Sequence, residues 1–161
     1  MRIVIAGDGP PIVVVPGVQG RWEWMKPAVD ALARVCRVVT FSLADERTCG
    51  AAFDEARGFA CYLDQVRDAM DQAGVARAVI GGVSYGGLIA AAFAARYPDR
   101  VAGLLLVSAI PPSWRPDARV RFYLGAPRAL TPLFLLASLR LYREIAAAVP
   151  GMTAGARAAL Y

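Results

Sequence analysis

The sequence predicts an α/β fold in which a parallel sheet carries helices on both faces. Short apolar runs such as Ile12 to Val15 alternate along the chain with longer segments whose apolar residues recur at helical spacing. The short runs are continuous rather than alternating in polarity, which is typical of strands buried on both faces. A chain of 161 residues is long enough for one domain with a sizeable core.

Five strands are expected, each a short apolar run bounded by turn residues. The first, Met1 to Ala6, leads into Gly-Asp-Gly-Pro-Pro, which suits a hairpin or a tight connection. The other expected strands are residues 12–15, 37–43, 76–80 and 101–109.

Helices are expected between these strands. The first begins near Pro27 and places Val29, Leu32 and Cys36 on one face at helical spacing. Together, the alternation of strands and helices implies parallel strands joined by helical crossovers.

Two further helices have clear stop signals. Residues 59–73 are expected to be helical because Gly74 suits the C′ position. An alanine-rich helix then follows residues 81–87 and runs to about Tyr97, where Pro98 ends it.

Composition excludes disorder and leaves a membrane protein as the alternative to a covered α/β core. Hydrophobic residues make up 57% of the chain and charged residues 19%. The uncharged run Ala78 to Ala95 reaches the lower length limit for a spanning helix, but four glycines and a serine interrupt it. We therefore expect no membrane span. The first apolar run is broken at once by Gly7, which argues against a signal peptide.

The cysteines and the charges indicate neither a metal site nor a nucleic-acid partner. Cys36, Cys49 and Cys61 lack metal-ligand spacing and are typical of reduced thiols in a cytoplasmic protein. The net charge of +5 arises entirely from residues 101–161, where seven Arg face two acidic residues. Because these Arg are scattered among Pro and Leu, they predict a solvated or partner-facing surface.

Residues 82–86 read Gly-Val-Ser-Tyr-Gly and form a Gly-x-Ser-x-Gly motif between an expected strand and an expected helix. The motif places Ser84 on a strained turn, where side chains at Gly82 and Gly86 would collide with backbone. The following helix also directs its N-terminal amides at the site, which favours developing negative charge. The alternative is a glycine-rich turn needed only for close helix–sheet packing.

With these residues in place, the chain resembles the α/β-hydrolase family, in the group that carries a cap after the sixth strand. The resemblance extends over essentially the whole chain, from the stretch ending in Pro16-Gly17 to the strand that closes at Ala109. It implies Ser84 as nucleophile and an oxyanion hole formed by the backbone N–H groups of Tyr85 and Val18. It also implies a small ester, amide or related carbonyl substrate, and no cofactor.

The chain departs from the family pattern at several positions. Pro16 stands where the family usually has His, a change that should leave the Val18 amide usable. The family's catalytic acid and His follow its seventh and eighth strands, whereas this chain has no His and ends within the expected cap. Asp117, Asp45 and Glu46 are candidate substitute acids, but a surface charge in a Pro-Asp loop is the better interpretation of Asp117, and solvated loop carboxylates explain Asp45 and Glu46 as well.

The character of the sequence changes at Ile110-Pro111-Pro112. Residues 1–110 are interpreted as the N-terminal part of a hydrolase core, and residues 111–161 as the start of a helical cap. A helix capped by Thr131-Pro132 is expected there, and a second helical turn ends near Val149-Pro150-Gly151. The helix that begins at Thr131-Pro132 carries Leu133, Leu136, Leu139 or Arg140, and Tyr142. Leu133, Phe134 and Leu136 suit either the wall of a substrate pocket or helix packing.

The apolar strand at residues 101–109 would be an exposed sheet edge without the family's later strands. We therefore expect a truncated chain, the N-terminal part of a longer serine hydrolase, with the 161 residues alone inactive or weakly active. Two alternatives stay open: a non-catalytic ligand-binding module of the same fold, and a subunit whose missing strands, Asp and His come from a partner chain, such as another copy in a homo-oligomer.

Overall fold

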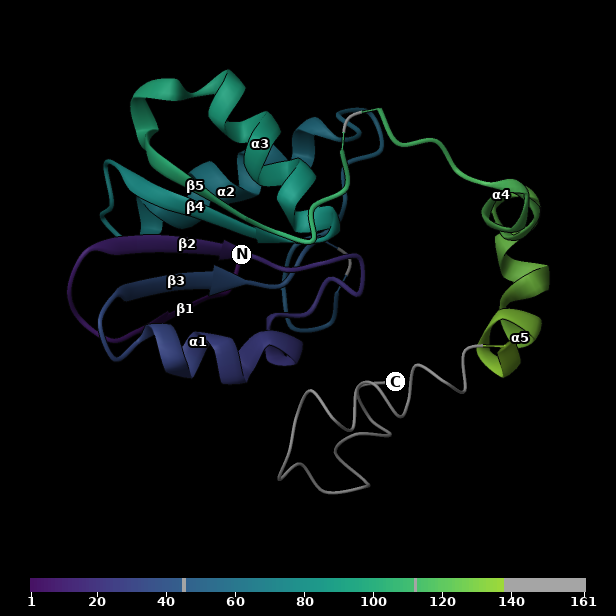
Figure 1. Ribbon diagram of the computed structural model, residues 1–161, viewed down its shortest axis with the longest axis horizontal. Coiled ribbons are helices and arrows are strands. Elements are labelled where there is room, and N and C mark those ends of the chain that lie inside the picture. The colour runs from purple at the N-terminus through teal and green to yellow at the C-terminus, as the bar shows by residue number, and fades with distance from the viewer. Residues whose placement is uncertain (45, 112, 138–161) are drawn as a thin grey trace. The chain divides into compact units, whose positions relative to one another are not determined.

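A computed structural model describes residues 1–44, 46–111 and 113–137 of the chain. The chain divides into two compact units, Met1–Pro112 and Ser113–Tyr161. The first unit holds one five-stranded sheet with the order β1-β3-β2-β4-β5 (Figure 1). Its strands are β1 Ile3–Ala6, β2 Pro11–Val15, β3 Arg37–Phe41, β4 Ala78–Val83 and β5 Val101–Val107.

The parallel sheet predicted from the apolar runs is confirmed for four of the five strands. β2, β3, β4 and β5 pair in parallel, with Val13 opposite both Val39 and Ile80. β1 pairs antiparallel with β3 and not with β2, so of the two expected alternatives, a hairpin or a tight connection, the structure has the tight connection. The connection is tight, as Gly7 and Gly9 have φ values of 73° and 123°, but it carries the chain past the position that β3 occupies.

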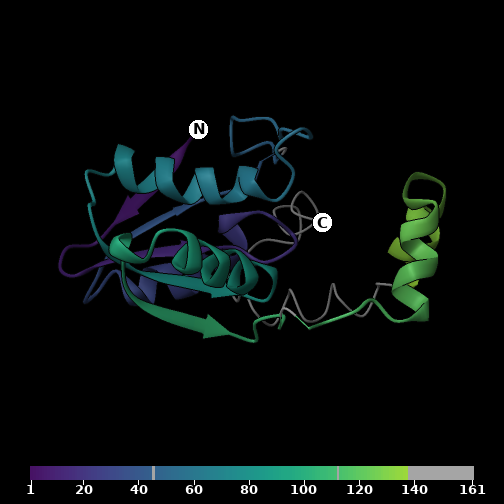
Figure 2. The same cartoon turned by 90° about the horizontal axis from the view of Figure 1, so that it is seen from above.

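Helices cover both faces of the sheet (Figures 1 and 2). α1 (Lys26–Leu32) lies on one face, where its buried Val29 joins a cluster with Ile12, Val14 and Val38. α2 (Ala60–Gln72) and α3 (Tyr85–Arg96) cover the other face. Strands buried on both faces explain the continuous apolar runs in the sequence.

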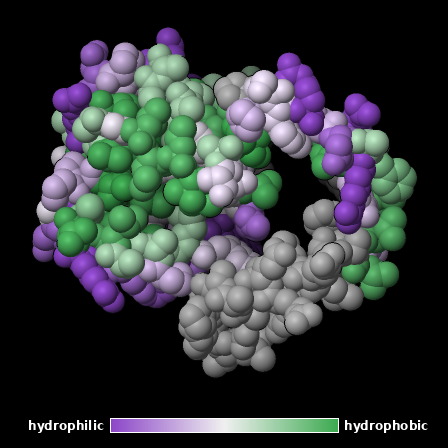
Figure 3. Space-filling view, in the orientation of Figure 1, coloured by the Kyte–Doolittle hydropathy of each residue, from purple (hydrophilic) through white to green (hydrophobic). Residues whose placement is uncertain are grey.

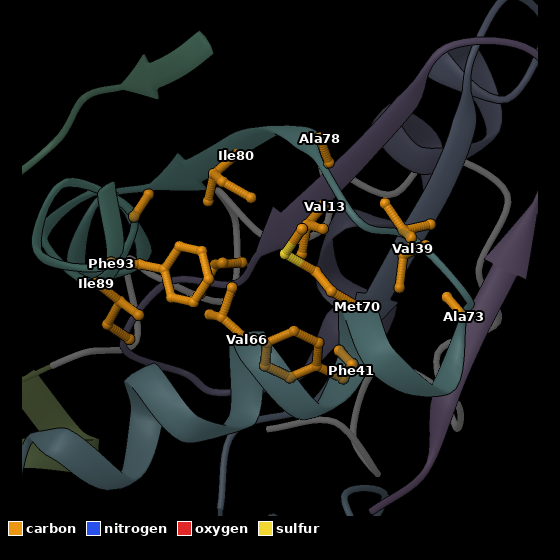
Figure 4. Packing of buried hydrophobic residues seen from close by; sticks show 14 of the residues in the cluster. Val13, Val39, Phe41, Val66, Met70, Ala73, Ala78, Ile80, Ile89 and Phe93 are labelled. Carbon is orange, nitrogen blue, oxygen red and sulfur yellow. The ribbon is translucent and has the colours of Figure 1, made fainter. Parts of the chain in front are cut away.

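The main core lies between the sheet and the pair of helices α2 and α3. Phe41, Ile80, Met70 and Phe93 are fully buried there, with the helical side chains directed at the strands (Figure 4). Burial of side chains of this size contributes about 2 kcal/mol each, which makes this layer the main source of stability for the first unit.

The helix boundaries differ from the predictions at α1. A 3₁₀ helix, η1 (Trp22–Met25), precedes α1, and α1 ends at Leu32, so Cys36 is not on its face. The helix ends because the chain must turn into β3: the N–H of Arg37 already bonds the carbonyl of Pro10 at 3.1 Å. A short 3₁₀ turn, η2 (Pro98–Arg100), follows the predicted stop at Pro98.

Gly74 occupies the predicted C′ position of α2. Its φ is 65°, and the N–H of Val75 reaches back to the carbonyl of Met70 at 2.8 Å. This is the Schellman arrangement, in which a left-handed residue lets the chain satisfy the last helical carbonyls.

In the second unit, the structure describes α4 (Ala118–Gly125) and α5 (Pro127–Ala137). α4 was not predicted, and α5 begins at Pro127 rather than at Thr131. Proline fits the first turn of a helix because its missing N–H is not needed there, while Pro132 lies inside α5. Leu139, Arg140, Tyr142 and the predicted turn at residues 149–151 lie outside the described residues.

None of the helices within the described part of the chain is long and apolar enough to span a membrane. The apolar run Ala78 to Ala95 is divided instead between β4, the turn at Ser84 and α3.

Candidate active site

Ser84 forms the one-residue turn between β4 and α3. Its φ is 53° and its ψ is −116°, a backbone conformation that non-glycine residues rarely adopt. Backbone bonds hold this conformation from the neighbouring strand: the Ser84 N–H donates to the carbonyl of Val107 at 2.9 Å, and the Ser84 carbonyl accepts from Ile110 N–H at 3.3 Å. Hydrogen bonds to β5 and to the segment after it therefore hold the Ser84 backbone in its strained conformation.

The side chain of Ser84 does not serve α3. Serine at an N-cap usually accepts a hydrogen bond from an amide in the first helical turn. Ser84 occupies the N-cap of α3 but makes no side-chain capping bond. Its hydroxyl is thus left uncommitted to the helix, next to amides whose dipoles favour negative charge.

Crowding explains the glycines around Ser84. A Cβ atom on Gly82 would overlap the carbonyl of Gly86, and one on Gly86 would overlap the carbonyls of Val15 and Pro16. Each obstacle is backbone, which cannot move aside cheaply, so these positions require glycine for the turn to form.

The loop after β2 passes directly beside Ser84. A Cβ atom on Gly17 would lie 3.7 Å from the Cβ of Ser84 and 3.4 Å from the carbonyl oxygen of Val83. The Gly20 N–H donates to the carbonyl of Gly17 at 2.9 Å, which closes a turn with Val18 at its first central position. The structure therefore places Gly17, the residue before Val18, against Ser84, and Val18 and Tyr85 line the same cavity.

A cavity of about 380 Å³ opens next to these residues. It is lined by Val18, Gly20, Leu43, Ala44, Glu46, Phe53, Tyr62 and Tyr85. Three of the eight are aromatic and one is charged. Phe53 and Glu46 come from the loop between β3 and α2, where no periodic pattern of residues predicts which side chains reach this site.

Aromatic rings pack against one another at the cavity wall. Tyr85 meets Phe59 edge to face at 6.2 Å between ring centroids, and meets Tyr62 at 5.9 Å. Phe53 lies 5.2 Å from Tyr62. Burial in this setting raises the pKa of the Tyr85 phenol above its ordinary value of 10, so the phenol is neutral at physiological pH.

Two of the three candidate substitute acids have structural partners. Asp117 is the N-cap of α4, accepting from the Val120 N–H at 2.8 Å. Glu46 pairs with Arg21 at 2.9 Å. Asp45 lies outside the described residues. Within the described ranges, no three His, Cys, Asp or Glu side chains are grouped as metal ligands would be.

A sequence model of the family described as the alpha/beta hydrolase fold matches residues 10–127. This match covers most of the chain, from β2 through the Ser84 turn to the start of α5. The chain belongs to the α/β-hydrolase family.

Solved structures agree with this assignment. The enol-lactonase from Burkholderia xenovorans LB400 is 27% identical to this chain, with a TM-score of 0.57. The match covers 64% of this chain and 41% of the lactonase chain. An N-acyl homoserine lactonase complexed with N-butanoyl homoserine is also 27% identical, with a TM-score of 0.61 and coverages of 68% and 41%.

A carboxylesterase from the thaumarchaeon Nitrososphaera gargenis shares the fold at 21% identity. Its TM-score is 0.63, and the match covers 94% of this chain and 50% of that chain. The chain thus spans at most half the length of each of these three hydrolases.

Proposed function

We propose that this chain carries the nucleophile of a serine hydrolase that acts on a small ester, amide or related carbonyl compound. The observation that carries the proposal is Ser84, held at a φ of 53° with a hydroxyl that does not cap α3. A strained serine displayed at a strand-to-helix turn is the arrangement that the Gly-x-Ser-x-Gly motif requires.

In this proposal the Ser84 hydroxyl attacks the carbonyl carbon of the substrate and passes its proton to a general base. The carbonyl oxygen becomes negatively charged and accepts hydrogen bonds from the N–H groups of Tyr85 and Val18. Preorganised donors of this kind contribute about 3 kcal/mol each to transition-state stabilisation in comparable hydrolases. Residues 1–110 would form the hydrolase core, and residues 111–161 the start of a cap over the substrate.

These 161 residues contain no histidine, so they do not supply the usual general base of this mechanism. A serine without a base is a weak nucleophile near neutral pH. An oxyanion hole without the full triad still retains about 10³–10⁴-fold catalysis over water. We therefore expect the 161 residues alone to be inactive or weakly active, with any acyl-enzyme formed at Ser84.

The related structures support an acyl substrate. Two of them are named as lactonases and one as a carboxylesterase, so each is named for cleavage of an ester bond. The cavity lined by Val18 and Tyr85, the two residues proposed to donate to the oxyanion, offers room for part of a substrate; Ser84 itself does not line it, and Glu46 contributes a charge to its wall.

The absence of histidine from the sequence also favours a second candidate, a ligand-binding module without turnover. Hydrolysis of p-nitrophenyl acetate separates the two. For the hydrolase, Ser84→Ala should remove the part of the rate that proceeds through an acyl-enzyme and leave only the residual rate of the oxyanion hole. Ser108→Ala is the matched control, because Ser108 also has a positive φ, follows the adjacent strand β5 and should be dispensable. Equal rates for the parent chain and Ser84→Ala would support the binding module.

A further inference from the structure

The loop that carries Gly17 and Val18 is fastened to the segment after β3. The carbonyl of Gly20 accepts a hydrogen bond from the Leu43 N–H at 2.6 Å. One residue later, Arg21 Nε donates to Glu46 Oε2 at 2.9 Å. These contacts join two loops that follow neighbouring parallel strands, β2 and β3.

Glu46 also fills the space next to Gly20. A Cβ atom on Gly20 would lie 2.7 Å from Cγ of Glu46 and 3.1 Å from its Oε1, so the Glu46 side chain lies directly against the Gly20 backbone. Gly20 has a φ of 73° and donates the hydrogen bond that closes the turn around Val18. Glu46 therefore contacts the turn both directly and through Arg21.

The Arg21–Glu46 pair is partly shielded from water. The side chains of Arg21 and Glu46 are 17% and 31% exposed, whereas those of the surface pair Lys26–Asp30 are 55% and 58% exposed. Exposed ion pairs contribute little because water and salt screen them, and a shielded charge-assisted hydrogen bond constrains its partners more strongly.

We propose that Glu46 is a positioning residue that holds the turn around Val18 beside Ser84. The proposal rests on the proposed function, in which the Val18 N–H is an oxyanion donor. Oxyanion donors are effective only when they are preorganised, so a loop that moves by a fraction of an ångström loses part of its effect. Glu46 acts on the position of Val18 through Arg21 and Gly20.

Hydrogen exchange tests the positioning role without requiring activity. Glu46→Gln keeps the size of the side chain and removes its charge. We expect amide exchange in residues 16–22 to become several-fold faster, most clearly at Gly20, while exchange in α3 is unchanged. Asp71→Asn is the matched control, because it removes another Arg–carboxylate pair, Asp71–Arg100 at 2.7 Å, at the opposite end of β4 and β5.

The rate of phosphonylation by a fluorophosphonate probe reports the consequence at Ser84. We expect Glu46→Gln to label about ten-fold more slowly than the parent chain, with no change for Asp71→Asn. The double variant Arg21→Glu with Glu46→Arg restores the ion pair with its charges exchanged. We expect it to recover part of the labelling rate and part of the protection from amide exchange. A defect that arose elsewhere in the structure would not be rescued in this way.

The two readouts separate the two proposals. Unchanged exchange in Glu46→Gln would overturn the positioning role, whatever the labelling rate. Faster exchange with an unchanged labelling rate would also overturn it, because the loop would then not matter to Ser84. If the parent chain were not labelled at all, the proposed function would fail, and the exchange data would still decide whether Glu46 holds the loop.

Discussion

Two serines carry backbone strain at the carboxyl edge of the sheet. Ser84 and Ser108, with φ values of 53° and 47°, are the non-glycine residues with positive φ in the described part of the chain. They follow the adjacent parallel strands β4 and β5. Such conformations cost of the order of 1–3 kcal/mol each and persist where the surrounding structure enforces them, often at functional sites.

At this scale, Gly86 should not tolerate a side chain. Gly86→Ala places a methyl group against the backbone carbonyls of Val15 and Pro16, which cannot retreat without disturbing β2. We expect the free energy of unfolding to fall by about 3 kcal/mol. Urea denaturation followed by circular dichroism measures this change.

Gly125→Ala is the control for that substitution. A Cβ atom there meets no neighbour within 4 Å, and the substitution lies in α4, where Ala is favoured over Gly. We expect a change of less than about 1 kcal/mol. Equal losses for the two variants would show that crowding at Gly86 is not what requires glycine.

The raised pKa of Tyr85 predicts a pH dependence of stability. Because the folded state binds the phenolic proton more tightly than the unfolded chain does, the stabilisation is fully present below pH 10 and is lost as the pH rises through the higher folded pKa. The unfolding free energy of the parent chain should therefore fall more steeply above pH 10 than that of Tyr85→Phe. Parallel profiles from pH 8 to pH 11 would contradict this account.

At the scale of elements, α2 is tied to the segment after β3 through one buried side chain. Gln65 is 5% exposed, and its Oε1 accepts from the Ala44 N–H at 3.0 Å. Ala44 is buried and lines the cavity beside Ser84. Gln65 therefore helps to fix one wall of the candidate site.

Gln65→Leu should leave the Ala44 N–H buried without an acceptor. The expected cost is about 1–3 kcal/mol of unfolding free energy, measured by urea denaturation. Gln72→Leu, at the exposed end of the same helix, should change the free energy by less than about 0.5 kcal/mol. A smaller loss for Gln65→Leu than for Gln72→Leu would count against the role of Gln65.

The elements differ in how well sequence alone predicts them. The strands from β2 to β5 were predicted because burial on both faces makes each a continuous apolar run. The helix α4 was missed because its signal is one capping residue, Asp117, which was interpreted as a loop charge after Pro116. The cavity could not be predicted, since Phe53 and Glu46 reach it from an irregular loop whose path depends on tertiary contacts.

At the scale of the whole molecule, β5 leaves an apolar strand at the edge of the sheet. Leu104, Leu105, Leu106 and Val107 are 43–47% exposed, and among the described residues β5 pairs with β4 alone. Figure 3 shows apolar side chains gathered on this face of the first unit. An edge strand of this kind promotes association between chains.

Leu104→Lys combined with Leu106→Lys should therefore reduce self-association of the chain. The two positions lie on one face of the strand, so the variant places two charges on the same apolar surface. Sedimentation velocity over a dilution series should show smaller species for this variant than for the parent chain. Leu124→Lys with Leu133→Lys is the control, because it adds the same charge in the second unit. If this control reduced self-association equally, the cause would be net charge and not the apolar edge of β5.

The central claim is that Ser84 is displayed as a nucleophile, and covalent labelling tests it most directly. A fluorophosphonate forms a bond between phosphorus and the serine oxygen as fluoride leaves, and peptide mapping by mass spectrometry identifies the modified serine among the five in the chain. Because the chain contains no histidine to act as base, we predict slow labelling, with the adduct on Ser84 alone and none on Ser108. An unlabelled chain, or an adduct spread over several serines, would contradict the account.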